Sequence, residues 1–165
     1  MAAVGSNLYI GGDFLTAGTS PARHIATWNG ATWSALGSGL GAPGQTLSHV
    51  ASIDGNVSGI FAGGLFTATG DGLLTLNNIG FWNGSTWSPL GSGTNDLVQQ
   101  IALWGDNLYV QGCFTQAGGV STTNVAVWNT TSQSWAAFDQ GWIPAENCGH
   151  AEFLITSTIT LSPAP

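Results

Sequence analysis

Hydrophobic residues recur at every second position in several short stretches of the chain. In the clearest stretch, Leu8, Ile10 and Gly12 alternate with Tyr9 and Gly11. A period of two residues places successive side chains on opposite faces of a β-strand. No stretch shows helical periodicity for more than about two turns. The pattern therefore predicts an all-β protein.

The predicted strands fall into three repeats of roughly fifty residues, each marked by the same landmarks in the same order. The first landmark is the block Leu8-Tyr-Ile-Gly-Gly-Asp-Phe14, whose final residue recurs as Phe66 and Phe114 at intervals of 52 and 48 residues. The next two landmarks are tryptophans, which form the pairs Trp28 and Trp33, Trp82 and Trp87, and Trp128 and Trp135. Recurrence of ordered landmarks at a fixed period indicates a tandem array.

Turn-forming residues divide each repeat into four strands. Asn29-Gly30 and Asn83-Gly84 lie between the two tryptophan-bearing strands, and Asn-Gly is typical of a tight type I′ hairpin turn. Asp54-Gly55 and the segment 105–107 predict two further turns before the strands that carry the first landmark. We therefore expect three four-stranded antiparallel repeats, at approximately residues 4–39, 47–93 and 97–141 of a single domain spanning 1–165.

The first repeat begins after most of its first strand, whereas the segments 47–53 and 97–103 supply this strand in the other repeats. The apolar segment near the end of the chain falls where the first strand of a fourth repeat would lie. We therefore expect a strand at 150–161 that completes the sheet of the first repeat.

The landmarks read Leu-Tyr-x-Gly-Gly-x-Phe, then Ile-Ala-x-Trp-Asn-Gly, then Trp-x-x-Leu-Gly-Ser-Gly, with the closing motif at Leu36 and Leu90. This pattern resembles the kelch-like β-propeller repeats of fungal cortical cell-polarity-marker proteins and of related secreted or cell-surface repeat proteins, over approximately residues 4 to 141. The resemblance implies that the repeats are propeller blades. The third repeat departs from the pattern, because Gln111 replaces the first glycine of its pair.

Propellers typically have about 4–8 blades. Three blades therefore indicate either part of a larger propeller or a ring assembled from several chains. Unpaired strand edges favour association with another chain, so self-association is expected. Twelve strands in three repeats also describe a β-trefoil, which is the structural alternative.

The composition combines 43% hydrophobic residues with only 5% charged residues, 25 Gly and 8 Trp. These values argue against a disordered chain and against a helical bundle. Arg23 is the one fixed positive charge, and the net charge is −7. Because a phosphate backbone must be met by several Lys or Arg side chains, nucleic acid is excluded as a partner. No apolar run is long enough to cross a bilayer, so membrane insertion is not expected.

Several features favour a protein that is secreted or displayed on the cell surface, although the sequence carries no signal peptide at its N-terminus. Lys is absent, and the N-glycosylation pattern occurs at Asn56, Asn83 and Asn129. Cys113 and Cys148 permit a single disulfide, and a buried free thiol is the alternative. Their spacing matches no zinc-binding pattern.

The carboxylates do not form a recognisable catalytic pair. Asp54, Asp71 and Asp106 stand next to Gly or Asn, where Asp stabilises turns through backbone hydrogen bonds. The histidines are dispersed over different repeat positions and lack metal-ligand spacing. We therefore expect no cofactor, no metal site and no catalytic residues. A glycosidase or oxidase on a propeller scaffold is the enzymatic alternative.

Tryptophan is the one residue type here that suggests a binding function, because aromatic rings stack on sugars. Six of the eight recur at repeat positions, which is typical of core residues. Trp104 and Trp142 break the pattern and are the candidates for ligand binding. The leading hypothesis is a non-catalytic extracellular module for protein interaction, scaffolding or self-assembly. The alternative is a carbohydrate-binding lectin, so the expected ligand is a protein or a glycan.

Overall fold

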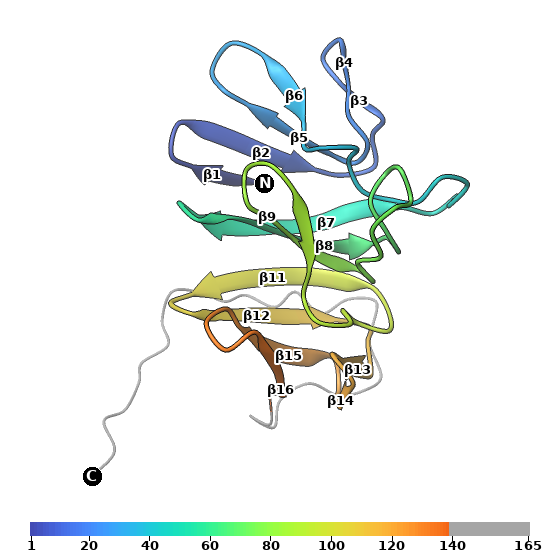
Figure 1. Ribbon diagram of the computed structural model, residues 1–165, viewed down its shortest axis with the longest axis vertical. Helices are drawn as coiled ribbons and strands as arrows, with labels where there is room; N and C mark the ends of the chain where they lie inside the picture. The colour runs from blue at the N-terminus through green and yellow to red at the C-terminus, as the bar shows by residue number, and fades with distance from the viewer. Residues whose placement is uncertain (139–165) are drawn as a thin grey trace.

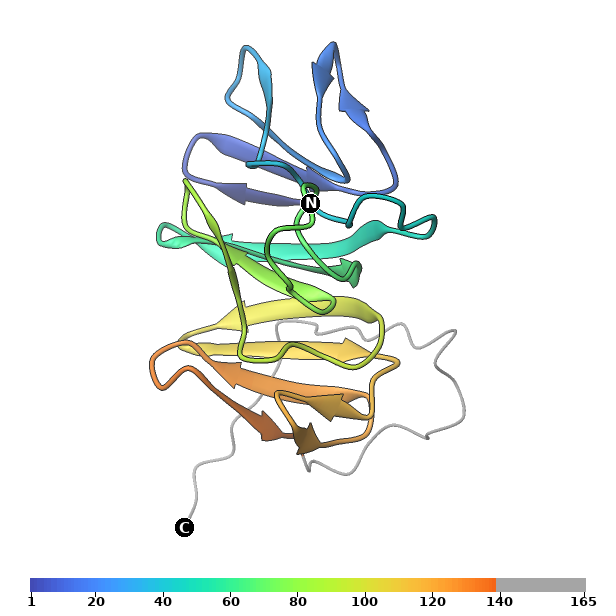
Figure 2. The same cartoon turned by 45° about the vertical axis from the view of Figure 1, so that its right-hand side comes forward.

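The computed structural model describes residues 1–138, which fold into three four-stranded antiparallel sheets and two short hairpins. The sheets are stacked one on another along the long axis of the molecule (Figure 1; Figure 2). No helix occurs in this part of the chain, and so none that could cross a membrane. The predictions of an all-β chain and of three four-stranded antiparallel repeats are confirmed.

Each sheet is built from strands that follow one another in sequence and pair with their neighbours. Sheet one contains β1 (Ala2–Val4), β2 (Asn7–Gly11), β5 (Ile25–Trp28) and β6 (Trp33–Ala35). Sheet two contains β7 (His49–Asn56), β8 (Gly59–Leu65), β9 (Ile79–Trp82) and β10 (Trp87–Pro89). Sheet three contains β11 (Val98–Trp104), β12 (Asn107–Gly112), β15 (Val125–Asn129) and β16 (Ser134–Ala137). The short hairpins pair β3 (Thr16–Ala17) with β4 (Ser20–Pro21), and β13 (Gln116–Ala117) with β14 (Val120–Ser121).

The first repeat has a first strand of its own, although a short one. β1 has three residues, whereas the equivalent β7 has eight. β1 pairs with β2 from Ala2↔Tyr9 to Val4↔Asn7, so sheet one has four strands without a contribution from the end of the chain. The strand expected at 150–161 lies outside the described residues.

The β-trefoil alternative does not fit the described residues. A trefoil requires strands of different repeats to join in one common sheet. Here every ladder of paired strands lies within a single repeat, and each repeat keeps its own four-stranded sheet.

Glycines in the second strand of sheets one and two allow the next sheet to approach closely. A Cβ atom on Gly11 would lie 2.3 Å from Cγ1 of Val50, and one on Gly63 would lie 2.4 Å from Cγ1 of Val98. The second strand of each sheet therefore packs against the first strand of the following sheet. Hydrogen bonds reinforce the second of these interfaces, where a side-chain oxygen of Asp54 accepts from the Leu103 amide at 2.7 Å.

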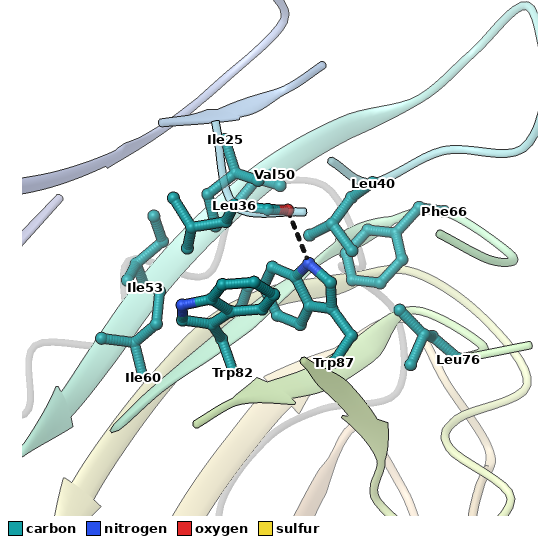
Figure 3. Close-up of a cluster of buried hydrophobic side chains, with 11 residues drawn as sticks. Ile25, Leu36, Leu40, Val50, Ile53, Ile60, Phe66, Leu76, Trp82 and Trp87 are labelled. Carbon is teal, nitrogen blue, oxygen red and sulfur yellow. Dashed lines mark hydrogen bonds between the residues drawn. The ribbon is translucent and has the colours of Figure 1, made fainter. Parts of the chain in front are cut away.

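Two hydrophobic clusters fill the spaces between the sheets. The cluster between sheets one and two joins Ile25, Leu36 and Leu40 to buried residues of the second repeat (Figure 3). Phe61, Ile79 and Leu90 begin the equivalent cluster between sheets two and three. A tryptophan links each pair of sheets: Trp87 Nε1 donates to the Leu36 carbonyl at 3.0 Å, and Trp135 Nε1 donates to the Leu90 carbonyl at 2.8 Å. The Leu-Gly-Ser-Gly motif thus supplies the acceptor that orients the following sheet.

Two turn predictions need correction. The loop that contains Asn29 has four residues and not two, because Trp28 pairs with Trp33. The loop is not a type I′ turn, because Gly30 has a positive φ and Ala31 does not. The Asn29 side chain helps to close it by accepting from the amides of Ala31 and Thr32 at 2.9 and 2.8 Å, beside a backbone bond from the Asn29 amide to the Thr32 carbonyl. An Asn side chain can replace a backbone carbonyl in this way.

The second correction concerns Asp54-Gly55, which lies inside β7 and not in a turn. The turn comes two residues later, at 57–58. Asp54 stays in the strand because its carboxylate satisfies the Gly55 amide and, across the interface, the Leu103 amide.

Candidate functional site

A face of sheet one is left partly uncovered, and this face is the candidate functional site. It is formed by apolar side chains of three strands and the loop after β2, and we call it the open face: Leu8, Ile10, Phe14, Trp28 and Trp33. Leu8 and Ile10 of β2 lie on one side because alternate residues of a strand point the same way. Register extends the face, since Leu8 pairs with Trp28 and Trp28 pairs with Trp33.

The equivalent residues of the other sheets are buried beneath the preceding sheet. In sheet two these residues are Ile60, Ala62, Phe66, Trp82 and Trp87, and each is less than a tenth exposed. They pack directly against residues of the first repeat (Figure 3). In sheet three the equivalents Leu108, Val110, Phe114 and Trp128 are buried as well, and the exception is Trp135, which is partly buried. The open face is therefore the same surface that carries an interface elsewhere in the molecule.

Trp33 lacks the hydrogen bond that its equivalents make. Trp87 and Trp135 donate to leucine carbonyls of the preceding repeat. Within residues 1–138, the indole N–H of Trp33 donates no hydrogen bond. The bond to a side chain that Trp33 makes there is through its backbone carbonyl, which accepts from Ser20 Oγ at 3.0 Å. The indole N–H of Trp33 is thus placed to donate to a group that another sheet would bring.

The tryptophan pairs have the same geometry in all three sheets. Ring centroids lie 5.2 Å apart for Trp28 and Trp33, 5.4 Å for Trp82 and Trp87, and 5.4 Å for Trp128 and Trp135. Sheet one therefore presents its pair in the arrangement that sheet two buries completely and sheet three buries at Trp128. The small hairpin β3–β4 covers part of this surface, where Ala17 joins a minor cluster with Ile10 and Trp33.

Sequence reasoning assigned Trp28 and Trp33 to the core because they recur in every repeat. The structure confirms that interpretation for Trp82, Trp87 and Trp128, which are buried, but leaves the first pair half-buried. Among the described residues, no sheet packs on this side of sheet one.

Carboxylates for which the sequence predicted a role in turns accept hydrogen bonds from nearby backbone amides. Asp71 accepts from Thr69 Oγ1 at 2.6 Å and from the Leu73 amide at 3.0 Å. These hydrogen bonds lower the pKa of the exposed Asp71 carboxyl below its ordinary value. Between residues 1 and 138, no three His, Cys, Asp or Glu side chains lie close enough together to hold a metal ion.

His24 occupies a structural position that Asn fills in the other repeats. His24, Asn78 and Asn124 all have positive φ angles, of 62°, 71° and 63°. Asn78 uses both side-chain atoms, accepting from the Phe66 amide at 3.3 Å and donating to the Thr94 carbonyl at 3.1 Å. His24 is buried, and its Nδ1 lies 3.8 Å from an oxygen of Asp13, too far for a hydrogen bond. Burial lowers the pKa of His24.

The structure does not bring the predicted ligand-binding residues together. Trp104 ends β11 with 52% of its surface exposed, and Trp142 lies outside the described residues. Cys113 follows β12, and Cys148 also lies outside the described residues, so their disulfide stays a prediction. The three glycosylation candidates Asn56, Asn83 and Asn129 lie at hairpin tips.

Comparison with known proteins places limits on the family assignment. No protein-family model matches the chain. The chain is 32% identical over 97 residues to the polarized growth protein rax2 of the fission yeast Schizosaccharomyces pombe. The match covers 48% of this chain and 8% of the yeast protein. This similarity agrees with the predicted resemblance to fungal polarity proteins, and the kelch assignment stays a prediction.

Proposed function

We propose that this chain is a non-catalytic, extracellular β-propeller module that works by protein contact and self-assembly. The open face of sheet one carries the proposal. The five equivalent positions are buried in sheet two, and four of the five are buried in sheet three, whereas all five are only partly buried in sheet one. The same surface forms the interface with the preceding sheet in sheets two and three, so in sheet one it is suited to pack against a further sheet of the same kind.

The energetics of the open face favour coverage. Fully burying one large apolar side chain contributes about 1.5–3 kcal/mol relative to full exposure. The face presents two tryptophans, Trp28 and Trp33, with three further apolar residues, and each is partly buried already, so covering it would add a fraction of that value. Contiguous apolar surface that stays accessible to solvent marks interaction sites on soluble proteins. The indole N–H of Trp33 would orient the incoming sheet, because it can donate a hydrogen bond to an acceptor such as the Leu carbonyl of a Leu-Gly-Ser-Gly motif.

Stacking of blades explains the arrangement of the sheets. Each sheet follows the order of a propeller blade, with four antiparallel strands that pair in chain order, and packs against the next through its first two strands. A propeller closes when about 4–8 such blades surround an axis. The three sheets therefore require additional blades, from other copies or from other parts of a larger protein.

The similarity to a polarized growth protein supports a location where cell shape is organised. It concerns only 8% of that protein's length. The absence of Lys and the three glycosylation motifs support an exported protein. The proposal of a non-enzymatic role is supported by the use of Asp54 and Asp71 in backbone hydrogen bonds.

Light scattering coupled to size-exclusion chromatography tests self-assembly. We expect the mass of the wild-type chain to rise above that of the monomer with concentration. Trp28→Gln should return it to the monomer, because the open face loses its largest apolar contribution. Leu73→Gln is the matched control, because Leu73 is 87% exposed and lies outside the open face. A wild-type chain that stays monomeric at all concentrations, or equal effects of both variants, would contradict the proposal.

A lectin function is the second candidate, and the exposure of Trp104 favours it. Trp104 presents 52% of its surface at the end of β11. Binding to a glycan array that is lost in Trp104→Ala, while the mass in solution is unchanged, would support a sugar-binding site. Binding that survives this substitution would contradict it.

A further inference from the structure

All three glycosylation motifs lie on one edge of the stacked sheets. We call this the tip edge: it consists of the loops that join the first strand to the second, and the third to the fourth, in each sheet. In sheet two, Asn56 pairs with Gly59 and the adjacent Ile60 pairs with Trp82, which places Asn56 and Asn83 at the same end. The tips of the β7–β8, β9–β10 and β15–β16 hairpins lie on the left in Figure 2.

The alignment continues from sheet to sheet. Asp54, three residues before the β7–β8 turn at 57–58, accepts from the amide of Leu103, two residues before the β11–β12 turn at 105–106. In sheet three, Asn107 pairs with Asn129, so the third motif lies beside the β11–β12 tip. The tip edge therefore collects the motifs of two sheets.

The asparagine of each motif adopts the same local geometry. Its Oδ1 accepts a hydrogen bond from the backbone amide two residues later. In each case that amide belongs to the serine or threonine that ends the motif. The donor–acceptor distances are 2.9 Å for Asn56, 2.9 Å for Asn83 and 3.1 Å for Asn129. These hydrogen bonds fix the side-chain oxygen in all three motifs. The motifs differ in the contacts of the side-chain nitrogen Nδ2.

Asn56 and Asn83 present Nδ2 to solvent. Both residues are exposed, and no hydrogen bond involves either Nδ2 within residues 1–138. Asn129 is half-buried, and its Nδ2 donates to Asn107 Oδ1 at 2.9 Å. Its Oδ1 also accepts from Ser132, through both the amide and the hydroxyl, as the Oδ1 of Asn83 accepts from Thr86, so the bond of Nδ2 is what sets Asn129 apart. The amide of Asn129 is thus held in the sheet by contacts at both ends.

We propose that Asn56 and Asn83 carry N-linked glycans and that Asn129 stays unmodified. In this reaction Nδ2 forms a bond to C1 of the first sugar of a polyprenyl-diphosphate-linked oligosaccharide. The bond from C1 to the diphosphate oxygen breaks, the diphosphate leaves with the electron pair, and the amide gives up one proton to a base of the transferring enzyme. The proposal rests on the extracellular location in the proposed function.

Folded geometry can control the reaction because the hairpins are local. A β-hairpin forms in about 1–10 μs, whereas a ribosome adds about 5–20 residues per second. Asn107 and Asn129 are 22 residues apart in the same sheet. Their hydrogen bond can therefore form while the chain is being exported. Glycans on Asn56 and Asn83 would extend from the tip edge of sheet two and leave the open face of sheet one accessible.

The chain offers matched controls for both parts of the proposal. Asn29 closes its loop as Asn83 does, accepting from the Ala31 amide at 2.9 Å, but Ala31 carries no hydroxyl. Ala31→Ser completes the motif in the same geometry. Asn107→Ala removes the acceptor that holds Asn129 Nδ2, and Asn107→Asp retains an acceptor at that position.

The test is secretion of the full chain from a yeast cell, with glycan occupancy measured by peptide mass spectrometry. We expect occupied Asn56 and Asn83 and unmodified Asn129 in the wild type. Ala31→Ser should add a glycan at Asn29, and Asn107→Ala should add one at Asn129, whereas Asn107→Asp should leave Asn129 unmodified. Occupancy of Asn129 in the wild type, or empty sites at Asn56 and Asn83, would overturn the proposal.

Failure of this inference is distinguishable from failure of the proposed function. Mass spectrometry reports occupancy whatever the assembly state. Light scattering of the same secreted variants reports assembly whatever the occupancy. Equal gains at Asn129 for Asn107→Ala and Asn107→Asp would show that the hydrogen bond does not control modification, and would also overturn the proposal.

Discussion

The indole N–H groups that link successive sheets can be removed one at a time by Trp→Phe substitution. Trp135→Phe removes the donor to the Leu90 carbonyl, which is bound at 2.8 Å. Leu90 is 1% exposed, so its carbonyl belongs to a residue shielded from solvent. A buried acceptor left without its partner costs about 1–3 kcal/mol. Trp33→Phe removes the same atoms from a tryptophan that is also half-buried but donates no such bond within residues 1–138.

The two substitutions remove similar ring surface, so their difference isolates the hydrogen bond. We expect Trp135→Phe to lower the free energy of unfolding by about 1–3 kcal/mol more than Trp33→Phe. Trp87→Phe should show the larger loss, because Trp87 is buried as well as bonded to Leu36 at 3.0 Å. The loss of the larger ring adds to the cost there.

Urea unfolding at a concentration where the chain is monomeric measures these differences. Tryptophan fluorescence and far-ultraviolet circular dichroism should give coincident transitions, which justifies a two-state treatment. A change in the midpoint at constant m value reports stability alone. Equal losses for Trp135→Phe and Trp33→Phe would refute the reasoning, because they would show that the bond between sheets contributes nothing to stability.

Three further substitutions test other contacts by the same urea unfolding. Gly63→Ala should destabilise by about 1–3 kcal/mol, because its Cβ would meet the next sheet at 2.4 Å, whereas at Gly12 the nearest contact is 3.4 Å and alanine should have little effect. Asp54→Ala should cost about 1–3 kcal/mol by leaving the Leu103 amide unpaired, and an undiminished stability would contradict the role of that bond. The pKa of His24 is lowered by burial, so the stability linked to its neutral form is present above the unfolded pKa and is lost as the pH falls through that value. His24→Asn should remove this component of the acid sensitivity, and an unchanged pH profile would contradict the assignment.

The electrostatic surroundings of His24 make that last measurement specific. Burial is the largest influence and lowers the pKa, and Arg23 and His49 lower it further. Asp13 and a backbone hydrogen bond with Gly12 oppose them by favouring the charged form. Asparagine at this position has no titrating group, and in the second repeat it makes two hydrogen bonds. The variant should therefore be at least as stable as the wild type at neutral pH.

Local sequence patterns predicted the strands of the three four-stranded sheets, but not the short hairpins β3–β4 and β13–β14. Alternation of apolar residues is a property of neighbouring positions, and the landmarks at Phe14, Phe66 and Phe114 repeat it three times. Turn chemistry is less readable, because several backbone solutions suit the same residues. Asn29-Gly30 does form a turn, but its side chain closes a four-residue loop where a type I′ turn was predicted.

The environment of each residue was decided by tertiary structure. Trp28 and Trp82 have almost the same local sequence, yet Trp28 is only partly buried and Trp82 is buried, because within residues 1–138 a sheet covers this side of sheet two and none covers it in sheet one. Asn83 and Asn129 share a modification motif, yet strand register places Asn107 beside only the second. By itself the sequence determined that this chain forms three four-stranded repeats. Which surfaces they bury and which they present depends on contacts between residues far apart in the chain, and neighbouring sequence does not encode these contacts.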